Sequence, residues 1–383
     1  MGRQPQIRAA TALLARPLAR RVRRVLAVAL AAALAPALLA GCRKTETAVA
    51  LPPLGAVAGQ TSVSGISSGA YMAGQFQLAH GPEVVGAGII AGGPYGCAES
   101  LFADLMPGPG SAFLNITKAI NGCMLNAMQV WGVPNPPMLA DRARSLAQRQ
   151  DIAPIEATLG DRVYLFTGRS DHTVVPAIVA SAAAFYRELG MPAQQIKFVD
   201  TLDAGHAFVT ENAGLSCDST GKPYVVDCDY DQAGDMLTFI YGPLQPPAAK
   251  PTGEFIVFDQ TAFTRDFTNH GMESSGVVYV PAACRDDGAR EPAGCRVHIA
   301  FHGCAQNRAL VGDSFIRDTG FARWADTNRL VILFPEAATS PFNPQGCWDW
   351  WGYTGRNYLT RTAPQIEAVY RMLMRLTVRG QPS

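Results

Sequence analysis

The feature that most constrains the fold of this chain is the pentapeptide Gly65 to Gly69, which lies in the stretch TSVSGISSGAYMAGQFQLAH. The pattern is G-x-S-x-G. It predicts a short strand around 62–64, a sharp turn, and an amphipathic helix over 70–79. A serine at such a turn exposes its hydroxyl, and the flanking glycines allow a close backbone approach. Ser67 is therefore a candidate nucleophile. The alternative is an ordinary serine in a turn of small residues.

The chain after this serine alternates strands and helices. Apolar runs and helical spacing predict strands at 84–90, 163–166 and 196–199 and helices near 176–189 and 232–240. This alternation is typical of a parallel sheet with helical crossovers. Residues 94–150 contain two cysteines and several prolines and are predicted to be an irregular insertion over a site. Residues 212–230 are predicted to form a loop closed by cysteines.

A candidate acid and a candidate base follow the serine in the order that an α/β-hydrolase requires. Asp171 comes directly after one predicted strand, in GRSDHTVVP, and His206 comes just beyond the next, in DAGHAF. A serine hydroxyl needs a base, and the base needs an orienting acid, so the three residues predict a catalytic triad with Ser67 as nucleophile. Asp203 is the rival acid. His172 is adjacent to Asp171, which directs its side chain elsewhere.

The predicted oxyanion hole draws on a segment that lies far downstream. Its first donor is the N–H of Ser68, and the second should come from the loop after a neighbouring strand. The matching segment, VHIAFHGCAQN, offers Cys304 directly after His302 and Gly303, but it follows the serine instead of preceding it. A helix predicted over 363–376 likewise resembles the element that should lead into the nucleophile strand.

Joining the C-terminal helix to Val57 restores the usual order, and the proline-rich stretch 242–253 then marks where the original ends were fused. We therefore predict a circularly permuted α/β-hydrolase with a mostly parallel central sheet, flanking helices and disulfide-stapled loops, in one catalytic domain over 57–380. Permutation requires only that the two ends lie close together at the surface. The alternative is two domains with a coincidental His-Gly pair. The remaining strands are predicted at 255–258, 276–280, 297–301 and 330–334.

The first 41 residues have the pattern of an export signal. They carry seven of the 32 Lys and Arg residues and no acid, followed by an apolar run over 25–39. The ending Leu39-Ala40-Gly41-Cys42 resembles a bacterial lipobox, so Cys42 is predicted to be lipidated and 42–56 to be a tether. An ordinary cleavage site and an uncleaved anchor are the alternatives. Arg43 favours the outer membrane, with a periplasmic or surface position; secretion is the other outcome.

The other eight cysteines predict disulfides, because they are even in number in an exported chain. Spacing favours four pairs among many connectivities: Cys97–Cys123, Cys217–Cys228, Cys284–Cys295 and Cys304–Cys347. The histidines form no metal-ligand spacing with cysteines or acids, so no metal or other cofactor is expected. Without its basic leader the chain is mildly acidic and has no basic stripe, which excludes a nucleic-acid partner. A monomer is expected.

Eight motifs together resemble those of the polyhydroxybutyrate depolymerases, most closely the single-domain, circularly permuted kind. In chain order, over most of residues 57–378, they are GISSGAYMAGQFQLAH, GRSDHTVVP, DAGHAF, CDYDQAGDML, FDQ, VYVPAAC, FHGCAQN and GCWDWWGY. The resemblance implies the same triad, Ser67, Asp171 and His206, and the same donors, Ser68 and Cys304. It implies that an aromatic run lines the substrate crevice: Trp348, Trp350, Trp351 and Tyr353. The alternative for each is core packing.

The resemblance implies two-step ester hydrolysis of poly(3-hydroxybutyrate) or its oligomers, with a polyester chain as the partner in the crevice. A feruloyl or acetylxylan esterase on the same scaffold is an alternative, since it would keep the triad and change only the pocket. A non-catalytic envelope lipoprotein is a further alternative, against which the complete triad argues.

Overall fold

The computed structural model describes residues 47–100, 109–285 and 294–379. The predicted signal peptide, 1–41, and the predicted lipidation site, Cys42, lie outside the described residues. Ala48–Ser383 forms one compact unit, which is the unit described below.

The unit is organised around an eight-stranded sheet with the order β4-β3-β2-β1-β10-β11-β9-β8. Its strands are β1 (Thr61–Ile66), β2 (Val84–Ile90), β3 (Arg162–Phe166), β4 (Ile196–Val199), β8 (Glu254–Asp259), β9 (Ser275–Val280), β10 (Arg296–Phe301) and β11 (Leu330–Phe334). Only β9 runs antiparallel to its two neighbours, β8 and β11. The mostly parallel sheet predicted from the sequence is thus confirmed.

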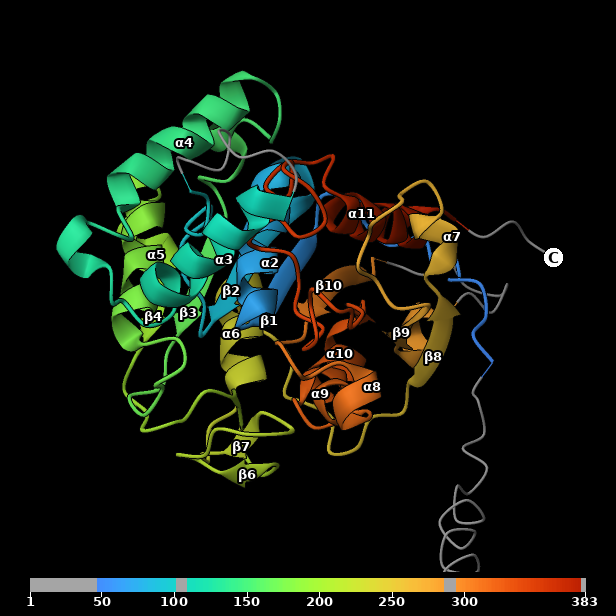
Figure 1. Cartoon of the computed structure of the whole chain (residues 1–383). Coiled ribbons are helices and arrows are strands. Elements are labelled where there is room, and N and C mark those ends of the chain that lie inside the picture. The colour runs from blue at the N-terminus through green and yellow to red at the C-terminus, as the bar shows by residue number, and fades with distance from the viewer. Residues whose placement is uncertain (1–46, 101–108, 286–293, 380–383) are drawn as a thin grey trace, which may run out of the picture. The chain divides into compact units, whose positions relative to one another are not determined.

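The strand order shows the permutation directly. From β8 the chain visits β9, β10 and β11 on one half of the sheet, whereas β1 to β4, the other half, come earlier in the sequence. The halves join where β1 pairs in parallel with β10, with Val63 opposite Ile299. In Figure 1 the blue β1 accordingly lies beside the orange β10, although more than 200 residues separate them. The residue after the last helix of the unit lies beside the segment that leads into β1, since Gly55 N–H donates to the carbonyl of Val378 at 2.9 Å.

Helices cover both faces of this sheet (Figure 1). They are α2 (Ser68–Ala79), α3 (Pro109–Cys123), α4 (Pro136–Gln148), α5 (Pro176–Leu189), α6 (Gln232–Tyr241), α7 (Thr261–Thr264), α8 (Arg308–Val311), α9 (Ser314–Arg317), α10 (Phe321–Asn328) and α11 (Pro364–Thr377). Residues of α2, α5 and α11 form one core with Val163 and Leu165 of β3. Residues of α6, α9 and α10 form the other with the alternating Tyr164 and Phe166.

Two predicted elements differ from the structure. The helix after the serine is not amphipathic, because all twelve residues of α2 are buried; neighbouring elements cover it on every side. The segment 94–150 is not irregular: it contains α3, α4 and a short 3₁₀ turn, Gln129–Trp131. The side chain of Asn135 accepts the Met138 N–H and begins α4, with prolines in the first turn. Its many prolines and glycines made the segment resemble a loop.

The predicted tether is partly integrated into the folded unit. Val49 forms a bridge with Phe258 of the edge strand β8, and Leu51, Leu54 and Ala56 are buried. Residues 48–56 therefore pack as part of the fold, because their apolar side chains cover the core beside the end of α11.

The structure contains the four disulfides that the spacing favours: Cys97–Cys123, Cys217–Cys228, Cys284–Cys295 and Cys304–Cys347. The second closes the 212–230 loop, in which β6 (Leu215–Ser216) and β7 (Val225–Asp227) form a small sheet with the preceding β5 (Phe208–Thr210). Disulfides persist in oxidising compartments, so this is an exported protein.

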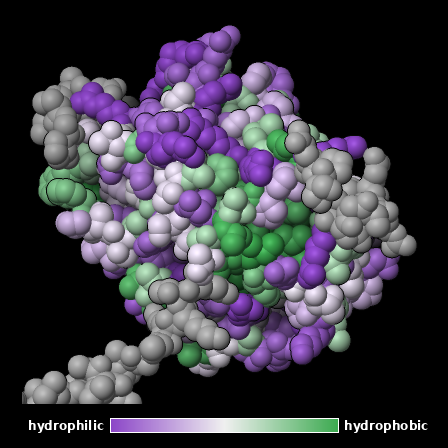
Figure 2. All heavy atoms as spheres, turned by 90° about the vertical axis from the view of Figure 1, so that its right-hand side faces the viewer, coloured by the Kyte–Doolittle hydropathy of each residue, from purple (hydrophilic) through white to green (hydrophobic). Residues whose placement is uncertain are grey.

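In Figure 2, apolar side chains gather in one central area of the face that carries α7, α11 and β8, and hydrophilic side chains surround them. In the part of the chain that the structure describes, no helix is long and apolar enough to cross a bilayer.

The proximity of Gly55 and Val378 predicts that the permutation can be reversed. A chain that starts at Pro247, joins Val378 to Ala48 through a flexible glycine linker and ends at Pro246 should fold, since every strand pair and the packed residues 48–56 are kept. We expect a thermal midpoint within about 5 °C of the natural order. Calorimetry and circular dichroism check this, and an aggregated or unstructured product would show that the two halves are not one cooperative unit.

Candidate active site

The turn that carries Ser67 is strained and tightly enclosed. Ser67 has φ 57° and ψ −121°, a left-handed backbone that costs a non-glycine residue about 1–3 kcal/mol. The enclosure explains the two glycines. A Cβ on Gly65 would overlap the carbonyl of Gly69, and a Cβ on Gly69 would overlap the carbonyls of Phe301 and His302. The serine is therefore held between its own strand and the end of β10, and it is 8% exposed.

The candidate acid and base meet in a buried hydrogen bond. His206 Nδ1 lies 2.8 Å from Asp171 Oδ2, with almost no exposed surface on either side chain. The other carboxylate oxygen of Asp171 accepts the N–H groups of Thr173 and Val174 at 2.8 and 2.9 Å, which orients the carboxylate. Because the carboxylate can only accept, Nδ1 carries the proton, and Nε2 is left to act as a base.

The rival acid is placed elsewhere. The Asp203 side chain is 77% exposed and faces Arg169 at 3.8 Å, and His172 is exposed. Backbone hydrogen bonds fix the loop that carries His206. The His206 N–H donates to Thr220 Oγ1 at 2.9 Å, and the Gly205 N–H donates to the carbonyl of Cys217. The Cys217–Cys228 disulfide thus supports the position of the histidine.

The two predicted oxyanion donors belong to segments that border the serine. Ser68 is the first residue of α2, whose leading N–H groups have no partner within the helix. Gly303, next to Cys304, packs against the serine, since a Cβ there would lie 3.4 Å from Ser67 Cβ. Within the described residues, neither the Ser68 nor the Cys304 N–H donates to a protein acceptor. Both amides remain available to a developing negative charge.

The loop that carries Cys304 is anchored from several directions. The disulfide ties Cys304 to Cys347, and Ala305 N–H donates to the carbonyl of Gln345. Trp348, which follows Cys347, donates its N–H to Ser68 Oγ at 3.3 Å. One short segment, 345–348, therefore contacts both parts of the predicted oxyanion hole.

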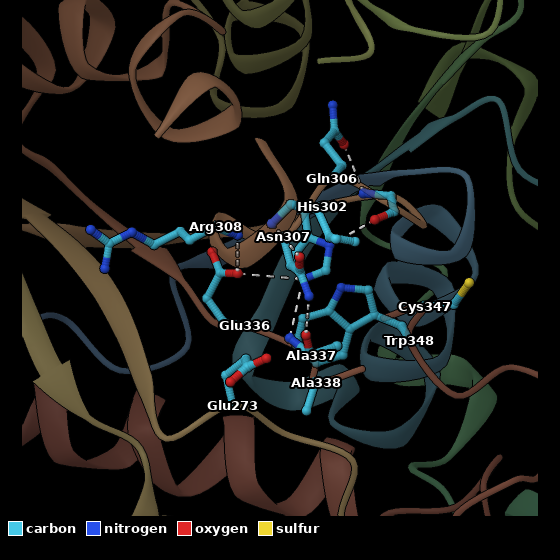
Figure 3. Close-up of polar contacts among 12 residues, drawn as sticks. Glu273, His302, Gln306, Asn307, Arg308, Glu336, Ala337, Ala338, Cys347 and Trp348 are labelled. Atoms are coloured by element: carbon cyan, nitrogen blue, oxygen red, sulfur yellow. Dashed lines mark hydrogen bonds and ion pairs between the residues drawn. The ribbon is translucent and has the colours of Figure 1, made fainter. Parts of the chain in front are cut away.

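Behind this loop lies a buried polar cluster that sequence reasoning did not identify as functional (Figure 3). His302 Nε2 accepts the Ala337 N–H at 3.1 Å and faces Glu336 Oε2 at 3.9 Å. Glu336 in turn accepts the Arg308 N–H at 2.9 Å. Burial lowers the pKa of His302 to about 4 and raises the pKa of Glu336 to about 8. The only sequence signal for this cluster is the polar run His302 to Asn307 directly after an apolar strand.

The aromatic run divides into two roles. Trp348 and Trp350 pack in the core, at 0% and 5% exposure, and Trp350 stacks on Tyr71 with ring centroids 4.0 Å apart. This is the core-packing alternative that the sequence left open. Trp351 and Tyr353 instead line a pocket of about 640 Å³ with several other side chains, including Phe113, Ile116, Asn269 and Phe342. Asp349 folds this segment, because its carboxylate accepts the N–H groups of residues 351–354.

Across the described part of the chain, no three His, Cys, Asp or Glu side chains are grouped so that they could hold a metal ion. The site geometry itself defines a class: a serine on a strand-to-helix turn, a His–Asp pair at neighbouring strand ends, and paired amides are the arrangement of an α/β-hydrolase.

Comparison with known proteins identifies the family within that class. No protein-family model matches the chain. It is 36% identical over 342 residues to a poly(3-hydroxybutyrate) depolymerase of Delftia acidovorans, covering 88% of this chain but only 64% of that relative's length. It is 34% identical over 327 residues to a polyhydroxybutyrate depolymerase of Talaromyces funiculosus, covering 81% of this chain and 87% of the relative.

Solved structures agree. A PHB depolymerase from Penicillium funiculosum superposes with a TM-score of 0.73 at 31% identity, covering 86% of this chain and 99% of that one. A serine-to-alanine variant of a PHB depolymerase, complexed with an R3HB trimer, has a TM-score of 0.74 at 31% identity with the same coverage. The chain belongs to the polyhydroxybutyrate depolymerase family.

The buried Glu336 predicts a pH effect on stability. Its folded pKa of about 8 lies above its ordinary value of 4.5, so the folded state binds this proton more tightly, and the free energy of unfolding falls as pH rises between those values. Glu336→Gln keeps an oxygen for the Arg308 N–H and removes the titration. Denaturant unfolding should therefore show that the unfolding free energy of the variant, relative to that of the wild type, is higher at about pH 9 than at about pH 5.

Asp161, whose pKa burial raises to about 7, titrates in both proteins and cancels in this comparison. If the unfolding free energies of the variant and the wild type differ by the same amount at both pH values, the raised pKa of Glu336 is contradicted.

Proposed function

We propose that this protein is a carboxylic ester hydrolase that cleaves poly(3-hydroxybutyrate) or its oligomers. The observation that carries the proposal is the buried His206–Asp171 hydrogen bond of 2.8 Å, on the same sheet edge as the strained Ser67 turn. The substrate class is supported by the relatives, which are named for this polymer, and by the related enzyme complexed with an R3HB trimer.

In the proposed mechanism, Ser67 Oγ attacks the ester carbonyl carbon while His206 Nε2 takes its proton. The Asp171 carboxylate stabilises the imidazolium. The N–H groups of Ser68 and Cys304 stabilise the oxyanion, and His206 returns the proton to the leaving alcohol. Water, deprotonated by His206, then cleaves the acyl-enzyme and frees the acid and Ser67. No cofactor enters any step.

Asp171, which bonds the histidine, and the exposed Asp203 provide a matched test of the triad. Ser67→Ala should abolish turnover of hydroxybutyrate trimers, and Asp171→Asn should lower kcat by about 10⁴-fold, because it removes the group that fixes the tautomer of His206. Asp203→Asn makes the same chemical change at the exposed carboxylate and should alter kcat by less than about 2-fold. Equal losses in the two aspartate variants would reject the triad.

Feruloyl and acetylated-sugar esters assayed beside the trimer separate the polyester reading from another esterase on this scaffold. Turnover of those esters in preference to the trimer would reject the proposed substrate. Lack of activity on every ester, short p-nitrophenyl esters included, would favour a non-catalytic lipoprotein.

We further propose that the pocket at Trp351 and Tyr353 holds part of the polyester chain. It presents mostly apolar walls, and Phe113 and Phe342 at its rim are 69% and 84% exposed. Apolar walls of this kind suit the methyl-bearing repeat units of a polyester. Phe342→Ser, which leaves the core untouched, should weaken binding and turnover of polymer about 3-fold or more while leaving kcat on a p-nitrophenyl ester unchanged. Parallel losses on both substrates would contradict this assignment.

For localisation, we propose that residues 1–41 are a signal peptide and that Cys42 carries a lipid anchoring a monomeric catalytic domain, 57–380, to the cell envelope. The leader composition and the Leu39–Cys42 ending support this. Cys42→Ser should move the enzyme from the membrane fraction to the soluble periplasmic or secreted fraction. A wild-type protein found entirely in the soluble fraction would reject the anchor.

A further inference from the structure

His302 connects the loop behind the predicted oxyanion hole to a neighbouring segment of the chain. It follows β10, is 1% exposed, and uses both ring nitrogens (Figure 3). Nδ1 lies 2.7 Å from the carbonyl oxygen of Gly303, and Nε2 lies 3.1 Å from the Ala337 nitrogen. His302 therefore bridges the loop to the segment after β11.

These two contacts fix the state of the ring. A carbonyl oxygen can only accept, so Nδ1 carries a proton and donates it to Gly303. A backbone N–H can only donate, so Nε2 is unprotonated and accepts from Ala337. The imidazole is therefore neutral with its proton on Nδ1, and burial also favours the neutral ring.

The bond to the Gly303 carbonyl has a consequence for the next residue. The peptide between Gly303 and Cys304 is planar, and its C=O and N–H point in opposite directions. Holding the carbonyl toward the His302 ring therefore turns the Cys304 N–H away from the ring. The loop packs against the serine, as the 3.4 Å between a Gly303 Cβ and Ser67 Cβ indicates. Rotation of this one peptide would remove the donor.

We propose that His302 is a positioning residue whose Nδ1–H, by holding the Gly303 carbonyl, directs the Cys304 N–H into the oxyanion hole. This role rests on the proposed ester hydrolysis. Other contacts hold the residues on either side of this peptide: Gln306 Oε1 accepts the preceding Gly303 N–H at 2.7 Å, and Gln306 Nε2 donates to the carbonyls of Pro223 and Tyr224. The Gln306 N–H reaches the same Gly303 carbonyl at only 3.3 Å, a weaker contact.

Two substitutions separate the two bonds of the ring. His302→Asn keeps an amide N–H near the position of Nδ1 and loses the acceptor for Ala337. His302→Gln keeps an oxygen near the position of Nε2 and loses the donor to Gly303. His298→Gln is a matched control, because His298 lies four residues earlier on β10, is equally buried, and hydrogen-bonds the hydroxyls of Ser62 and Ser64.

We expect H302Q to lower kcat on a hydroxybutyrate trimer about 10- to 100-fold, below the full loss of an oxyanion donor, with KM changed less than about 3-fold. Its rate of inactivation by a p-nitrophenyl phosphonate, whose phosphoryl oxygen needs the same donors, should fall in parallel. H302N should retain kcat within about 5-fold. H298Q should lose thermal stability while keeping kcat within about 3-fold.

The outcomes are distinct. The positioning role of His302 is overturned if H302Q has the kcat of the wild type, or if H302N is as impaired as H302Q. In either case, turnover by the wild type still supports the proposed function. If H302Q does not fold, H302N decides alone, since loss of its kcat overturns the role. If the wild type hydrolyses no ester and is as inactive as the Ser67→Ala control, both the proposed function and the positioning role are rejected.

Discussion

The contact between the serine turn and the end of β10 is the constraint on which the rest of this structure depends. Gly69 leaves no space for a side chain because the carbonyls of Phe301 and His302 lie against it. The contact joins residues from opposite ends of the chain, so neither half forms it alone. It brings the left-handed Ser67 and the loop of Cys304 together. The strain at Ser67 is tolerated because β1, with parallel partners on both sides, cannot move away.

The layers of support around this contact have different chemical characters. The sheet and its two cores set the position of the strand ends to which the functional residues are attached. Disulfides and backbone bonds then restrict the loops of His206 and Cys304. Buried side chains, such as Asp171 and His302, finally choose single orientations and tautomers. In a low-dielectric interior, a buried polar group without a hydrogen-bond partner raises the free energy of the folded state. Arrangements that break these bonds are therefore unfavourable, and the site keeps one arrangement.

Much of this arrangement could be predicted from the sequence, for identifiable reasons. The strands β2 and β4 and the helix α5 have the predicted bounds, because apolar runs and a first-turn proline mark their limits. The permuted order followed from the downstream His302-Gly303 segment together with the C-terminal helix predicted over 363–376. The helices of 94–150 were missed because disulfide and proline signals also describe loops. The amphipathic reading of α2 failed since burial on all sides depends on the tertiary structure. The roles of Trp348 and Glu336 depend on which residues surround them in the folded structure, and the local sequence pattern does not contain that information.

Residues distant in the sequence should form one site around Ser67, and a crystal structure of the protein inactivated with a p-nitrophenyl phosphonate would show whether they do. We expect a phosphonate bonded to Ser67 Oγ, with its phosphoryl oxygen about 2.7–3.1 Å from the nitrogens of both Ser68 and Cys304. An adduct on another residue, or an oxygen on Ser67 that points away from both amides, would contradict it.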